Sequence, residues 1–79
     1  MAMSGIFEIN LHGKNEYQAK VTIDAALRRA KAGTYRLRLI HVYHGGTALR
    51  DMIRREYTDK CLRVLPLDNG RTDLVLREF

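Results

Sequence analysis

Apolar and polar residues alternate at the start of the chain, and this pattern predicts a strand. In residues 7–11, the apolar Phe7, Ile9 and Leu11 alternate with polar side chains, as in a strand with one buried face. Residues 35–43 begin with the same alternation and then become continuously apolar. Continuous apolarity is typical of a strand that is covered on both faces. We therefore predict that this second strand lies centrally in a sheet.

Two segments have a period of three to four residues instead, which predicts two helices. The first helix begins near Asn15, because Asn15 and Gln18 have the spacing of a capping box, and Gly33 is expected to end it. The second helix follows a pair of glycines, with Thr47 as its cap. The apolar residues expected to face the core are Ala19, Ile23, Ala26, Leu27 and Ala30 in the first helix, and Leu49, Met52, Ile53 and Tyr57 in the second.

Two more strands are predicted near the C-terminus, at residues 62–67 and 72–79. The turn residues 68–70 separate them, which indicates a terminal hairpin. The predicted order is therefore β-α-β-α-β-β. This order predicts a small α/β domain, built as a two-layer α+β sandwich with a four-stranded mixed sheet and two helices. We assign residues 1–5 to an N-terminal tail and residues 6–79 to one domain.

The composition allows one hydrophobic core. The chain has 79 residues, of which 46% are hydrophobic, and this length is short for more than one domain. Its single cysteine, Cys61, has no internal disulfide partner, and we expect a small core residue rather than a nucleophile. The sequence shows neither a signal-peptide pattern nor an apolar stretch of transmembrane length, so we expect a cytoplasmic protein with no membrane partner.

The charge of the chain favours an anionic partner. Lysine and arginine together number 14 against nine acidic residues, which gives a formal net charge of +5. Most of the basic residues are arginine, which binds phosphate and carboxylate groups in planar, bidentate geometry. Some of this charge is expected simply to face solvent. The residues assigned to the solvated side of the first helix are Lys20, Arg28, Arg29 and Lys31.

The predicted order places two loops at one edge of the sheet. Consecutive strands joined by a helix are normally parallel, and ligands of open α/β sheets bind at the carboxyl ends of such strands. Residues 12–14 and 41–47 follow these two ends. In the second loop, two glycines either leave amide N–H groups free for an anion at a helix start or only form a turn. The residues expected to contact nucleic acid are Gly13, Lys14, His41, Gly45, Gly46, Thr47, Arg50 and Arg54.

Three histidines are predicted near this edge, and each is a candidate acid, base, phosphate contact or structural group. His12 lies in the first loop, His41 within a strand pattern, and His44 beside the glycines. If the protein cleaves nucleic acid, His12 or His44 would transfer a proton while Arg50 and the loop amides stabilise the phosphate charge. A histidine metal site is not predicted, because no Cys, Asp or Glu stands at ligand spacing beside the three residues.

Two segments resemble the sequence motifs of the Smr (small MutS-related) domain family. Residues 9–13, Ile-Asn-Leu-His-Gly, resemble its Leu-Asp-Leu-His-Gly motif, and residues 44–50 resemble its second, glycine-rich motif. The resemblance spans nearly the whole chain, so that residues 6–79 would form the Smr-like domain. It implies a fold similar to the C-terminal domain of bacterial translation initiation factor three. The motif positions carried over are His12, Gly13, Gly45, Gly46, Leu49 and Arg50.

The resemblance implies nucleic-acid binding and, as in several family members, endonuclease activity that nicks DNA or cuts RNA. It also implies a place in a larger assembly or at the ribosome. Asn10 replaces the acid of the first motif, so a metal-binding or base role of that acid does not transfer to this chain. The glycine-rich motif matches from either His41 or His44, and its register stays open.

Three functions follow from the sequence, in order: a nucleic-acid binding module for DNA or RNA, a nuclease, and a protein-interaction domain. No cofactor is predicted, apart from a divalent metal ion if the protein is a nuclease. Tyr17, Tyr35 and Tyr57 are assigned core or sheet positions, whereas Tyr43 is a candidate for stacking on a base. Salt separates the first function from the third, because phosphate contacts weaken steeply as salt rises.

Overall fold

A computed structural model describes residues 5–30, 33–41 and 48–77 of the chain. These residues form a four-stranded mixed sheet and two helices, which confirms the predicted fold class and element order. The elements are β1 (Ile6–Asn10), α1 (Glu16–Arg29), β2 (Arg36–Ile40), α2 (Ala48–Tyr57), β3 (Arg63–Asp68) and β4 (Arg71–Val75).

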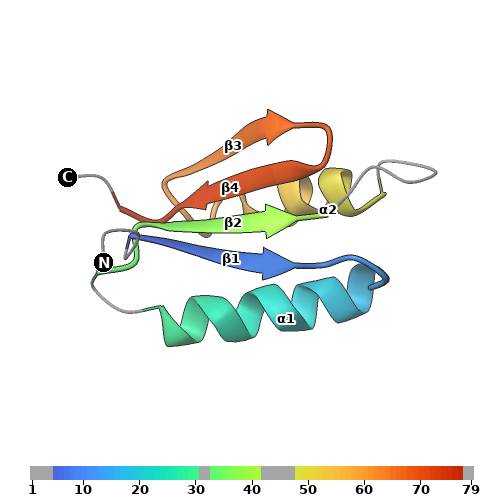
Figure 1. Ribbon diagram of the computed structural model, residues 1–79, viewed down its shortest axis with the longest axis horizontal. Coiled ribbons are helices and arrows are strands. Elements are labelled where there is room, and N and C mark those ends of the chain that lie inside the picture. The colour runs from blue at the N-terminus through green and yellow to red at the C-terminus, as the bar shows by residue number, and fades with distance from the viewer. Residues whose placement is uncertain (1–4, 31–32, 42–47, 78–79) are drawn as a thin grey trace.

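The strands lie in the order β1-β2-β4-β3, so β1 and β3 are the two lateral edges of the sheet (Figure 1). β1 and β2 are parallel, whereas β4 is antiparallel to both β2 and β3. The central position predicted for the second strand is therefore confirmed, and so is the terminal hairpin. The fourth strand ends at Val75, well before the predicted end at residue 79.

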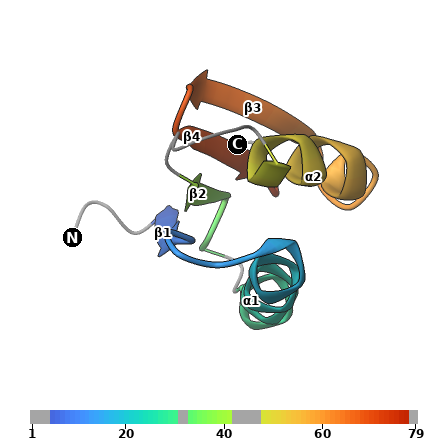
Figure 2. The same cartoon turned by 90° about the vertical axis from the view of Figure 1, so that its right-hand side faces the viewer.

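Both helices cover the same face of the sheet, and the other face is open (Figure 2). The prediction that β2 is covered on both faces is therefore wrong. Alternation continues along β2, because Leu37 and Leu39 are buried on the helix side while Arg36 and Arg38 lie on the open side. Both guanidinium groups bind the fully buried carboxylate of Asp73 in β4, at 2.9 to 3.0 Å. These ion pairs neutralise and hydrogen-bond the Asp73 carboxylate, and they do so without a second layer of helices.

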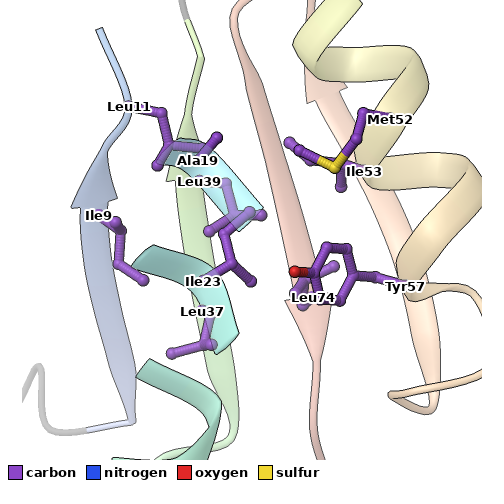
Figure 3. Close-up of a cluster of buried hydrophobic side chains, with 10 residues drawn as sticks. All are labelled: Ile9, Leu11, Ala19, Ile23, Leu37, Leu39, Met52, Ile53, Tyr57 and Leu74. Atoms are coloured by element: carbon purple, nitrogen blue, oxygen red, sulfur yellow. The ribbon is translucent and has the colours of Figure 1, made fainter. Parts of the chain in front are cut away.

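The core lies between the helix-covered face of the sheet and the two helices (Figure 3). The apolar face predicted for α2 is confirmed, because Met52, Ile53 and Tyr57 are buried and Leu49 packs against them. In α1, Ala19 and Ile23 of the predicted face are buried and Ala26 and Leu27 pack against the core, whereas Ala30 follows the end of the helix and is not part of this packing. The buried cluster consists of Ile9, Leu11, Ala19, Ile23, Leu37, Leu39, Met52, Ile53, Tyr57 and Leu74.

Helix α1 has the predicted start and a different end. Asn15 and Gln18 form a complete capping box, in which each side chain accepts a hydrogen bond from the other's backbone N–H. The helix ends at Arg29, because Ala30 already has an extended backbone with φ −62° and ψ 129°. Gly33 is therefore not the residue that ends the helix, and it has no left-handed backbone conformation.

The two helices are joined through Tyr57, which is fully buried in α2. Its hydroxyl donates a hydrogen bond to Oδ1 of Asp24 in α1 at 2.6 Å. Burial and this carboxylate raise the pKa of the Tyr57 phenol well above its usual value. Lys20 adds ion pairs of 3.8 Å to both Asp24 and Glu56. These contacts hold α1, which follows β1, against α2, which follows β2.

Cys61 packs against the core, as predicted, and is half-buried. Its thiol donates hydrogen bonds of 3.2 Å to the carbonyl oxygens of Tyr57 and Arg63. Burial raises the pKa of the Cys61 thiol, which disfavours the reactive thiolate. Within the described segments, neither helix has the length and apolar character needed to cross a membrane.

Candidate nucleic-acid interface

The carboxyl ends of β1 and β2 meet at one edge of the sheet, as predicted (Figure 1). We call this the carboxyl edge. The N–H of Leu11 donates to the carbonyl oxygen of Ile40 at 2.8 Å, so His12 and His41 follow two neighbouring strand ends. The β3–β4 turn lies at the same edge, because the N–H of His41 donates to the carbonyl oxygen of Gly70 at 2.8 Å.

The turn after β1 is held by its own backbone and by Asn10. The side-chain oxygen of Asn10 accepts a hydrogen bond of 2.8 Å from the N–H of His12. The N–H of Lys14 donates to the carbonyl oxygen of Leu11 at 3.1 Å, which closes the turn. Gly13 has φ +82°, a left-handed conformation that favours glycine. An aspartate at position 10 would offer the same acceptor oxygen. The conformation of the turn therefore accounts for the residue types at positions 10 and 13 without a catalytic or metal-binding role.

His12, Gly13 and Lys14 line a shallow hollow together with the first turns of α1. His12 is exposed. Tyr17 also lines the hollow, and its exposed fraction is 76%. The core or sheet position expected for Tyr17 is therefore wrong. Tyr17 instead presents an exposed aromatic ring in the same hollow as Lys14, at the carboxyl edge.

His41 is buried, with an exposed fraction of 5%. Its Nε2 lies 2.9 Å from the hydroxyl oxygen of Thr72, so the two side chains share a hydrogen bond. Burial lowers the pKa of His41, and the positive charges of Arg50 and Arg54 lower it further, while Asp68 acts in the opposite direction. The imidazole is thus kept neutral inside the protein, where it has almost no surface to offer a phosphate.

Arg50 and Arg54 lie in α2, and the positive charge of each lowers the pKa of His41. They are separated by one helical turn, as the sequence indicated. Nε of Arg50 is buried and has no hydrogen-bond partner among the described residues, and Oδ1 of Asp51 lies 3.5 Å from it, too far for a good bond. Arg54 is exposed, and the described residues give its side chain no ion pair.

Lys14 and Tyr17 follow β1, and Arg50 and Arg54 lie in the helix that follows β2, so all four belong to segments that begin at the carboxyl edge, and we call these four residues the edge cluster. Lys14 and Tyr17 lie on the β1 side, while Arg50 and Arg54 lie on the α2 side. The predicted His44, Gly45, Gly46 and Thr47, together with Tyr43, lie outside the described residues.

The β3–β4 turn is a part of this edge that the sequence analysis missed. Arg71 pairs with Asp68 at 2.8 Å, and Thr72 bonds His41. A hairpin whose second strand runs antiparallel to β2 must place its turn beside the carboxyl end of β2. The predicted turn residues 68–70 were the available signal, although the pairing of β4 with β2 rather than with β1 could not be read from them.

The chemistry of this edge is cationic and aromatic. Within residues 5–30, 33–41 and 48–77, no three His, Cys, Asp or Glu side chains are grouped so as to hold a metal ion. No family model matches the chain, and neither curated proteins nor solved structures gave a match.

Proposed function

We propose that the protein binds nucleic acid through the edge cluster. The observation that carries this proposal is that the segments following the neighbouring ends of β1 and β2 carry three cationic side chains and one exposed aromatic ring. Lysine and arginine contact phosphates, and an exposed tyrosine ring stacks on an unpaired base. The resemblance to the Smr domain supports the same function and the same edge of the sheet.

The electrostatics of the edge also support phosphate binding. Arg50 and Arg54 are one helical turn apart, the positive charge of each lowers the pKa of His41, and the Asp51 contact of Arg50 is loose. Like charges held together repel, and a phosphate between them relieves that repulsion. The buried His41 would then sense the bound anion, because neutralising either arginine raises its pKa. The free thiol of Cys61 fits the cytoplasmic location that we propose for this function.

The test is fluorescence anisotropy with labelled single-stranded RNA, single-stranded DNA and branched duplex DNA, over a series of salt concentrations. The Arg50→Gln/Arg54→Gln variant removes two positive charges from the edge. Its matched control, Arg28→Gln/Arg29→Gln, removes the same charge from exposed positions at the far end of α1. We expect the edge variant to bind at least tenfold more weakly and to lose about two units of salt slope. The control should keep most of the affinity and slope.

Tyr17→Ser separates stacking from charge. The substitution removes an exposed ring, so it should leave the fold unchanged and weaken binding of single strands by tenfold or more. The salt slope should stay the same, because no cation is lost. Equal losses in the Arg28→Gln/Arg29→Gln and edge variants, or no binding of any probe at low salt, would reject the proposal.

The same reactions, run with and without a divalent metal ion and analysed on a gel, test for cleavage. Products that appear with the wild type and are absent with His12→Ala would add an endonuclease activity to binding. No described residue singles out cleavage over binding, so binding alone is the expected result. A proton NMR titration of His41 adds a direct readout: its pKa should rise when nucleic acid occupies the edge.

A further inference from the structure

Among the residues that the structure describes, β1 pairs only with β2, so its other side is a lateral edge with unpaired backbone groups. The carbonyl oxygen of Gly5 accepts a hydrogen bond from Arg36 at 3.0 Å, and the N–H of Leu11 donates to Ile40. Backbone groups alternate in direction along a strand, so the odd-numbered residues of β1 bond to β2. Ile6, Glu8 and Asn10 therefore direct their N–H and C=O groups outward, and such an edge is a template for another strand.

An apolar groove of about 430 Å³ runs beside this edge, between β1 and α1. Phe7, Ile9 and Leu37 form its floor on the sheet side, and Thr22 and Ala26 line it on the helix side. Phe7 is 55% exposed although it faces the helix layer, because β1 is the last strand of the sheet and no described strand lies beyond it. Free backbone groups and an adjacent apolar groove are the two features that bind an extended peptide by strand addition.

The charge at the groove indicates which peptide fits. Arg29 lines the groove at the last turn of α1, and the described residues provide no ion pair for its side chain. Glu8 also lines the groove, but it lies opposite Arg38 in the sheet register and its charge raises the pKa of Arg38, so its side chain belongs to the open face rather than to the helix side. A peptide in the groove therefore meets one positive side chain, and an acidic residue complements it.

A second copy of this chain fits the groove less well. Antiparallel pairing of two β1 strands about Phe7 would match the exposed apolar residues of both copies. It would also bring two Arg29 side chains to one groove in a dimer whose chains each carry a formal charge of +5. Like charges at one contact oppose that arrangement.

We propose that β1 takes up an extended segment of another protein as a fifth strand. Apolar side chains at alternate positions of the segment fill the groove, and an acidic side chain next to them pairs with Arg29. This site lies along the side of β1 and uses no residue of the edge cluster, so it does not depend on the proposed nucleic-acid binding.

The test uses labelled ten-residue peptides with valine or leucine at alternate positions, threonine between them, and two glutamates at one end or the other. A matched set carries lysine in place of glutamate. With the full-length protein, we expect the acidic set to bind at least fivefold more tightly than the basic set. Arg29→Glu should reverse that order. Amide exchange of Ile6, Glu8 and Asn10 should slow when the acidic peptide binds.

Phe7→Thr tests the groove, and Leu62→Thr is its matched control. The two residues are 55% and 56% exposed, and Leu62 precedes β3 at the other lateral edge. We expect at least a fivefold loss of peptide affinity for Phe7→Thr and none for Leu62→Thr, with both proteins folded. Equal binding of the acidic and basic sets, no binding at millimolar peptide, or a wild-type dimer that Phe7→Thr dissociates would each overturn the proposal.

Discussion

Three residues at the carboxyl edge have structural roles that do not depend on a ligand. Gly13 is needed for a left-handed backbone, Asn10 closes the turn, and His41 is a buried partner of Thr72. Two of these residues belong to the segment that resembles a family motif, and the turn alone accounts for them. Lys14 and Tyr17, by contrast, line the hollow beside this turn, where they can touch a ligand.

His41 makes the stability of the protein depend on pH. Burial and two arginines lower the pKa of the folded imidazole, so between this value and the unfolded pKa of about 6.5 the unfolded state binds the extra proton. Stability is therefore full above pH 6.5 and falls as the pH drops below it. Urea titrations from pH 7.5 to 5 should show this loss for wild type and His12→Gln, and much less of it for His41→Gln. A wild-type profile that is flat over this range would contradict the prediction.

Gly13→Ala should destabilise the protein by about 1 kcal/mol, because alanine disfavours the left-handed conformation. No atom lies within 4 Å of the added methyl group, so backbone strain is the only cost. Gly33→Ala is the control, since its position is equally open and has no left-handed φ. Chemical denaturation should show a loss for position 13 and a small gain or no change for position 33.

At the scale of elements, the sheet differs in character between its two faces. One face packs on helices, and the open face carries the ion pairs around Asp73. Because Arg36 and Arg38 enclose a carboxylate that is fully buried, these ion pairs are part of the packing of β2 against β4. The helices are joined in a similar way, through the Tyr57–Asp24 hydrogen bond.

Asp73→Asn should therefore cost about 3 kcal/mol of unfolding free energy, since removing one partner of a buried ion pair leaves the other groups unsatisfied. Glu8→Gln, an exposed acidic position on the same face, should change stability by less than about 0.5 kcal/mol. Urea denaturation at pH 7 measures both. A loss for Asp73→Asn no larger than that for Glu8→Gln would show that the ion pairs are dispensable.

At the scale of the molecule, local patterns predicted the elements and not their partners. The capping box at Asn15, the apolar face of α2 and the terminal hairpin were all readable, because each depends on neighbours a few residues apart. The cover on β2 was misjudged, because Arg36 and Arg38 are paired with Asp73, more than 30 residues away. Likewise, no local signal distinguishes an exposed Tyr17 from a buried one, so the sequence predicted Lys14, Arg50 and Arg54 of the edge cluster and not Tyr17.

The arginine-covered face has a consequence for aggregation. A fibril grows in two directions: strands add at sheet edges, and sheets stack face to face with dry contacts between them. The β1 edge allows the first kind of growth. Stacking on the open face would strip water from Arg36 and Arg38 without offering a new counter-charge, and that desolvation is costly. The protein can thus expose a strand edge to a partner while its own sheets are kept from stacking.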